Sequence, residues 1–161
     1  MKSARHDLAI AMLLVAVALR GFAAEPLAQR IRHTDLSTVL EGHSHGGVGT
    51  VQYRRALDSN VFLTNLAYMD HEVIPPGASD GLHRHNGVKE VYCVMEGIAT
   101  FQLNDEKEPV KAGDAIPVKF YEAHAIINNG SAPIELMVMG TAAKKDVIDT
   151  ELGSLPRGPA Q

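Results

Sequence analysis

The sequence has very little cysteine and no excess of positive charge. Its 161 residues include one cysteine, Cys93, so no intramolecular disulfide can form and stability must come from packing or a bound metal. The formal net charge is −4, which argues against a nucleic-acid-binding protein because such proteins present a basic face. The sequence also shows no internal repeat, coiled-coil heptad or low-complexity tract. These absences exclude disulfide scaffolds and repeat proteins and leave one ordinary globular domain.

The chain has no apolar run long enough to span a bilayer. The longest run, Leu8–Leu19, has 12 residues, whereas a transmembrane helix needs roughly 20. Basic residues precede this run and small residues follow it before Glu25, an order typical of a secretory signal peptide over residues 1–24. The alternative is an apolar helix that packs on the domain or anchors it. We therefore expect an exported protein, periplasmic or secreted, with no stable membrane insertion after signal removal.

The rest of the chain is predicted to be all-β, with short helices at its flanks. Residues 25–47 form an N-terminal extension with a short helix over 34–41, capped by Thr34, and a Gly/His-rich loop. Residues 48–141 contain short strands separated by turn residues, which favours a sandwich or barrel. Residues 142–161 are predicted to form a short helix and a loose tail. Strands are predicted over residues 48–54, 61–73, 82–85, 88–95, 98–103, 114–118, 123–128 and 134–139, with a polar turn at 104–107.

A His-x-His pattern is the strongest indication of chemistry. Residues two apart on a strand point to the same face, so His83 and His85 can present two imidazoles side by side. A turn at Asn86-Gly87 would let Glu90 return on the neighbouring strand and face the same pocket. Two imidazoles and a carboxylate make a site for a first-row divalent metal. A fourth ligand must come from elsewhere, and His124, on a later strand among apolar neighbours, is the best candidate.

The same residues resemble the first motif of the cupin family. That motif is Gly, five residues, His-x-His, three or four residues, Glu, six residues and Gly. The chain has Gly77, His83, His85, Glu90 and Gly97 at every one of these positions.

The family's second motif is present in an altered form. It is Gly, five residues, Pro-x-Gly, two residues, His, three residues and Asn. Gly113, His124 and Asn128 fit the spacing, while Lys119 and Tyr121 replace the proline and the second glycine.

The resemblance covers roughly residues 48–140 and implies a single cupin barrel, that is, a double-stranded β-helix or jelly roll. It implies that one divalent ion (Fe, Mn, Zn, Ni or Cu) binds to four ligands, namely His83, His85, Glu90 and His124. Neutral imidazole and carboxylate ligands disfavour copper(I). The resemblance also implies that Asn128 holds a turn, and that the motif glycines serve turns where a side chain is unwelcome.

Two residues next to Glu90 have different predicted roles. Tyr92 should share the inward face of Glu90 and could act as a general acid or base. Cupin lyases that cleave dimethylsulfoniopropionate are similar in having Glu-x-Tyr after His-x-His, with the tyrosine as base. The alternative is that Tyr92 only packs inside the barrel. Cys93 should face away and serve as a buried packing residue.

Two further groups have open interpretations. His43 and His45 form a second His-x-His, which we interpret as an exposed mobile loop rather than a second metal site, although it could fold over the barrel mouth as a lid. Arg54 and Arg55 are adjacent on a strand, so one can point inward and suit an anionic substrate. The alternative for them is a surface salt bridge.

The predicted function is metal-dependent chemistry on a small molecule. The candidates are a lyase, decarboxylase, isomerase or dioxygenase that acts on a small polar or anionic substrate. The alternative is a non-catalytic periplasmic cupin that binds a small molecule or a metal. By analogy with small cupins we also expect a homodimer, whose sheet contacts would cover strand edges.

Overall fold

The computed structural model describes residues 26–62 and 64–145. The predicted signal peptide and most of the predicted C-terminal helix and tail lie outside these residues. The chain divides into two units, residues 1–33 and 34–161, and the described part of the first contains one short helix, α2 (Leu27–Arg30). Within the described ranges, no helix combines the length and the apolar character needed to cross a membrane.

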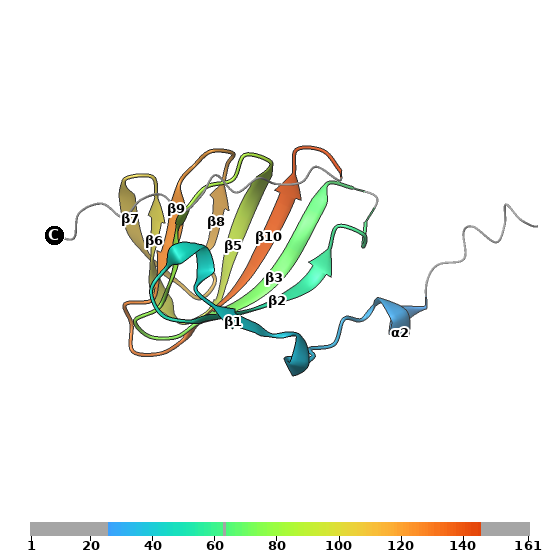
Figure 1. Cartoon of the computed structure of the whole chain (residues 1–161), viewed down its shortest axis with the longest axis horizontal. Helices are drawn as coiled ribbons and strands as arrows, with labels where there is room; N and C mark the ends of the chain where they lie inside the picture. Colours follow the sequence, from blue (N-terminus) through green and yellow to red (C-terminus); the bar gives the residue numbers. More distant parts are fainter. Residues whose placement is uncertain (1–25, 63, 146–161) are drawn as a thin grey trace, which may run out of the picture. The chain divides into compact units, whose positions relative to one another are not determined.

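The second unit consists of two antiparallel sheets (Figure 1). The strands are β1 (Leu40–Gly42), β2 (Val51–Asp58), β3 (Leu66–Ile74), β4 (Ser79–His83), β5 (Val88–Glu96), β6 (Ile98–Leu103), β7 (Glu106–Lys111), β8 (Ala115–Val118), β9 (His124–Ile127) and β10 (Ile134–Ala142). The six-stranded sheet has the order β1-β2-β3-β10-β5-β8, and the four-stranded sheet has the order β4-β9-β6-β7. This arrangement confirms the predicted all-β jelly-roll fold.

Side chains from both sheets form a common core. Ile74, Ile126, Ile134 and Leu136 are all fully buried and come from β3, β9 and β10. Tyr92 of β5 meets Phe101 of β6 edge-on, with ring centroids 5.2 Å apart. Such a pair contributes about 0.5–1.5 kcal/mol beyond the area that it buries. The core thus holds the two sheets against each other.

Two local predictions were wrong. The helix predicted over residues 34–41 is a 3-10 turn, Leu36–Thr38, followed by β1. Its cap is Asp35, not Thr34, because the Asp35 carboxylate accepts the backbone N–H of Ser37 at 2.9 Å. β7 was missed because its charged, proline-containing sequence has no apolar alternation, yet charge and proline suit a strand at the edge of a sheet.

The turn of the second motif forms although Lys119 and Tyr121 replace its proline and second glycine. Tyr121, at the motif's second glycine position, adopts a left-handed φ of 66°, and its N–H donates to the carbonyl of His85 at 2.8 Å. The backbone N–H of Lys119 donates to the Glu122 carboxylate at 2.8 Å. A non-glycine residue in this conformation costs roughly 1–2 kcal/mol. The neighbouring hydrogen bonds therefore keep the turn at some energetic cost.

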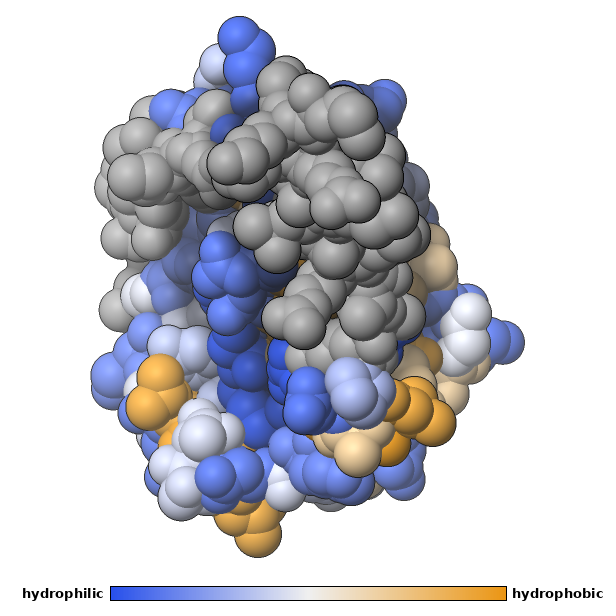
Figure 2. Space-filling view, turned by 90° about the vertical axis from the view of Figure 1, so that its right-hand side faces the viewer, coloured by the Kyte–Doolittle hydropathy of each residue, from blue (hydrophilic) through white to orange (hydrophobic). Residues whose placement is uncertain are grey.

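Hydrophilic residues prevail on the face shown in Figure 2, where hydrophobic residues form small separate patches. Isolated exposed apolar side chains of this kind are usual on protein surfaces.

Candidate metal centre and ligand pocket

The structure brings the four predicted ligands together between the two sheets. His83 ends β4 and His124 begins β9, both in the four-stranded sheet, while Glu90 lies on β5 in the six-stranded sheet. His85 follows β4. All four side chains are buried, and their ligand atoms lie within 4.8 Å of one another. These residues could hold a metal ion.

Backbone carbonyls orient two of the imidazoles. Nδ1 of His83 donates to the carbonyl of Gly81 at 2.8 Å, and Nδ1 of His124 donates to the carbonyl of Glu122 at 3.1 Å. In a neutral His83 ring, a protonated Nδ1 leaves the lone pair on Nε2, and outer contacts of this kind typically support metal-binding histidines. Nε2 of His83 is buried and has no hydrogen-bond partner among the described residues. Burial lowers the pKa of His83 to about 4, so the ring is neutral at pH 7 and suited to an ion.

The carboxylate of Glu90 is held at both oxygens. Oε2 accepts from Nε2 of His124 at 2.8 Å, and Oε1 accepts from the hydroxyl of Tyr68 at 2.6 Å. Burial alone would raise the pKa of Glu90, but the hydrogen bond from His124 and the charges of His85 and His124 outweigh it and lower the pKa. Glu90 is therefore ionised, and with three imidazoles it fits a first-row divalent ion.

Tyr68 occupies a space that a glycine leaves open. A Cβ at Gly140 would lie 2.5 Å from Cζ of Tyr68, so only glycine admits the ring there. The guanidinium of Arg55 lies over the Tyr68 ring, 4.6 Å from its centroid. Tyr68 was not predicted as a site residue. Its position directs its hydroxyl to Glu90, so it acts by positioning a ligand.

Tyr68→Phe is expected to weaken metal binding by about tenfold or more, because loss of an outer-shell hydrogen bond typically costs 10–100-fold in affinity. Competition with a chelator of known affinity measures the change. Tyr53→Phe is the matched control, since Tyr53 lines the same pocket without a hydrogen bond to Glu90. Equal affinities for the two variants would contradict the positioning role.

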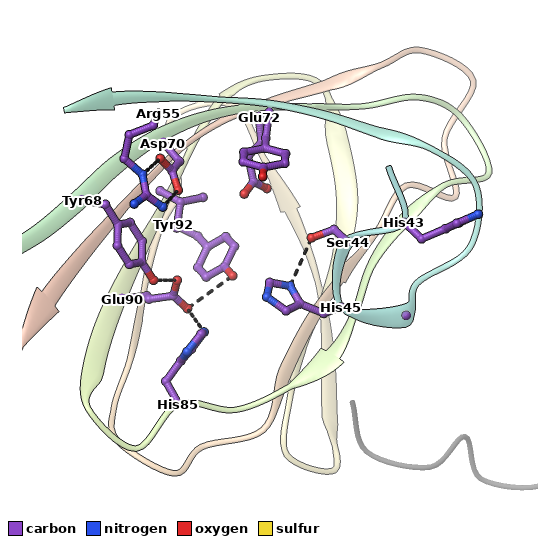
Figure 3. Close-up of a pocket in the computed structure, with 13 residues that line it drawn as sticks. His43, Ser44, His45, Arg55, Tyr68, Asp70, Glu72, His85, Glu90 and Tyr92 are labelled. Carbon is purple, nitrogen blue, oxygen red and sulfur yellow. Dashed lines mark hydrogen bonds and ion pairs between the residues drawn. The ribbon is translucent and has the colours of Figure 1, made fainter. Parts of the chain in front are cut away.

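The centre opens onto a cavity of about 530 Å³ (Figure 3). Side chains of β2, β3, β5 and β10 line it, together with His85 and the loop before β2. The lining is rich in charged and hydroxyl groups, including Arg55, Asp70, Glu72 and Tyr92. The cavity is of a size that suits a small molecule.

Tyr92, the predicted catalytic residue, is buried beside the predicted ligands. Its hydroxyl lies 3.4 Å from Oε2 of Glu90 and 3.5 Å from Oδ2 of Asp80. Burial, followed by the charges of Glu90 and Asp80, raises the pKa of Tyr92 well above its usual value. The phenol therefore holds its proton and is a donor in this environment. Its participation in catalysis stays a prediction.

The two histidines of the second His-x-His, His43 and His45, lie in different environments. His43 is exposed, as expected for a loop, although it also contributes to the lining of the cavity (Figure 3). The same expectation was wrong for His45, whose ring stacks on His83 at 3.6 Å and donates from Nδ1 to Asp80 at 2.6 Å. Asp80 is almost completely buried on β4 and was missed by sequence reasoning. His45, Asp80 and His83 form a second group with metal-ligand spacing.

Close backbone packing fixes the loop that carries His45. A Cβ at Gly47 would lie 2.1 Å from the carbonyl oxygen of Ser79, and a Cβ at Gly81 would lie 2.3 Å from that of His45. The N–H of Ser79 also donates to the carbonyl of Val48 at 2.9 Å. The loop is thus docked on β4 and forms part of the cavity wall.

The remaining predicted residues fall on both faces of the large sheet. Arg55 points into the cavity and binds both carboxylate oxygens of Asp70, at 2.6 and 3.0 Å. The two interpretations of an inward arginine and a salt bridge therefore both apply to it. Arg54 is buried but does not line this cavity. Cys93 is half-buried rather than buried.

Comparison with known proteins agrees with this geometry. The family model for the cupin domain matches residues 70–140. The oxalate-binding protein of Thermotoga maritima is 28% identical over 109 residues, which cover 68% of the chain and 90% of that protein. An uncharacterized protein of Methanocaldococcus jannaschii is 30% identical over 84 residues, which cover 52% of the chain and 67% of that protein.

A solved structure is similar as well. The crystal structure of a predicted oxalate decarboxylase from Thermotoga maritima superimposes with a TM-score of 0.63 and 29% identity, covering 65% of the chain and 92% of that protein. The family match, the relatives and the two-sheet fold lead to one conclusion. The chain belongs to the cupin superfamily.

Proposed function

We propose that this cupin binds a short carboxylate ligand, with oxalate as the first candidate, through a divalent ion held by His83, His85, Glu90 and His124. One observation carries the proposal. The buried group of three imidazoles and one carboxylate opens directly onto a polar cavity of about 530 Å³. A divalent ion at such a centre supplies Lewis acidity toward oxygen ligands.

The names of two similar proteins support oxalate as the candidate. One relative, matched over 90% of its length, is an oxalate-binding protein, and the similar solved structure is a predicted oxalate decarboxylase. Because residues 1–24 predict a signal peptide, we place this function outside the cytoplasm.

A second candidate function is cleavage of the ligand. Tyr92 favours it, because a protonated hydroxyl within 3.4 Å of Glu90 could deliver a proton to a reacting molecule. Conversion of hydrogen oxalate to formate and carbon dioxide needs a proton on the carbon that loses carbon dioxide. The phenol of Tyr92 would be the donor, and the acid proton of hydrogen oxalate would restore the phenol.

Calorimetric titration of the metal-loaded protein with oxalate tests the proposal. We expect saturable binding that disappears after chelator treatment and returns on metal addition, because the ion provides the main ligand contact. Acetate, which has one carboxylate, should bind more weakly than oxalate. Protein that carries one equivalent of metal but binds neither oxalate nor malonate would overturn the proposal. Assay of the same samples for formate separates binding from decarboxylation.

A further inference from the structure

Glu72 is an acidic residue of the cavity that takes part in neither the metal centre nor a salt bridge with any described residue. It lies on β3 on the same face as Tyr68 and Asp70, opposite Tyr53 of β2 and Leu136 of β10. Figure 3 shows its carboxyl group directed into the cavity. Its Oε2 atom is buried and has no hydrogen-bond partner among the residues that the structure describes. A buried polar atom in this state costs about 1–3 kcal/mol, so it calls for a partner.

The surroundings of Glu72 favour its neutral form. Burial is the largest cause, and the nearby charges of Asp80, Glu90 and Asp70 add to it, so the pKa of Glu72 is raised well above its usual value. The guanidinium of Arg55 pairs with both oxygens of Asp70 rather than with Glu72. A neutral carboxyl group carries an O–H that can donate a hydrogen bond.

Two of the other donor side chains on this wall of the cavity are engaged. The hydroxyl of Tyr68 donates to Glu90, and the guanidinium of Arg55 donates to Asp70. A dicarboxylate bound to the ion has a second carboxylate with oxygens that the ion does not contact, and these need donors. We propose that Glu72, whose buried and unpartnered Oε2 atom belongs to a carboxyl group directed into the cavity, recognises those free oxygens through a hydrogen bond and thereby selects ligands that have a second carboxylate.

This inference rests on the proposed function and adds a specificity-determining residue to it. No bond is made or broken, because the proton stays on Glu72 within the hydrogen bond. A monocarboxylate would leave Glu72 unpartnered and bind more weakly than a dicarboxylate.

Oxalate affinity of the metal-loaded variants Glu72→Gln and Glu72→Ala tests the inference. Glutamine keeps a donor, so its affinity should stay within about threefold of wild type, whereas alanine should lose about tenfold or more, as expected for a hydrogen bond to a charged group. Metal content should be equal in all samples. Glu135→Gln is the matched control, because Glu135 pairs with His71 and does not line the cavity.

Three results would overturn the inference. The first is an equal loss of oxalate affinity in Glu72→Gln and Glu72→Ala, which requires an ionised Glu72. The second is an unchanged affinity in both variants, and the third is that neither variant loses the preference for oxalate. Infrared difference spectra of wild type against Glu72→Gln at pH 7 give a reading that needs no ligand. A protonated-carboxyl band that shifts on oxalate addition supports the inference, and a carboxylate band alone overturns it. Failure of wild type to bind any short dicarboxylate, with the protonated band present, is a failure of the proposed function instead.

Discussion

Replacement of His83 and His85 together by alanine is expected to abolish metal binding. Wild-type protein, purified without chelators or an affinity tag, should contain about one equivalent of a divalent metal, and the double variant almost none. The change removes two of the four buried ligand side chains, whereas loss of a single outer contact already costs 10–100-fold in affinity. Elemental analysis measures the content directly.

His43→Ala is the control for this experiment, because His43 is exposed and belongs to neither group of potential metal ligands among the described residues. It should retain full metal content. Full occupancy in the double variant would show that the ion binds elsewhere. Wild-type protein that contains no metal and takes up none on titration would contradict the metal centre itself and leave a ligand-binding or structural barrel.

Asn128→Ala is expected to destabilise the fold by about 3–5 kcal/mol. The side chain is fully buried and makes three hydrogen bonds: its Nδ2 donates to the carbonyls of Ile74 at 2.7 Å and Ala132 at 2.9 Å, and its Oδ1 accepts from Gly130 at 3.0 Å. Each bond contributes about 1 kcal/mol, and loss of the bond to fully buried Ile74 adds the cost of an unpaired buried carbonyl. The structure thus gives Asn128 the turn-holding position that the second motif implied.

Urea denaturation followed by circular dichroism measures this effect as a lower midpoint with an unchanged slope. Asn129→Ala is the neighbouring control, since the Asn129 side chain is exposed and makes one hydrogen bond, to Thr100 at 3.0 Å. Its cost should stay below about 1 kcal/mol. Similar costs for the two variants would contradict the role of Asn128.

The grouping of the four predicted ligands could be foreseen because it depends on local spacing. His83 and His85 are two residues apart, and a short turn separates them from Glu90, so alternation along adjacent strands is enough to place them. Alternation alone could not predict His124 as the fourth ligand, because His124 lies on a strand that is distant in sequence. The resemblance to the second cupin motif identified it. β6 was predicted with its observed bounds for the same local reason, since Ala99, Phe101 and Leu103 alternate with polar residues.

The wall of the cavity could not be foreseen, because it depends on contacts between distant segments. The strand predicted over 61–73 begins at Leu66, and β3 pairs with β10, so the inward positions of Tyr68, Asp70 and Glu72 follow from a register that no local pattern contains. The position of His45 likewise depends on a backbone contact between Gly47 and Gly81. Glycine pairs of this kind look like an ordinary loop in the sequence.

The two-sheet origin of the metal centre has a consequence for the lifetime of the protein. An ion bound to His83 and His124 on one sheet and to Glu90 on the other ties the sheets together in a chain whose single cysteine permits no internal covalent cross-link. Free metal at a hundredfold excess over its dissociation constant adds about 2.7 kcal/mol to stability and lowers the unfolded population roughly a hundredfold. Proteases that attack the unfolded chain would then degrade metal-free molecules first. The abundance of this protein would therefore follow the metal supply of its surroundings.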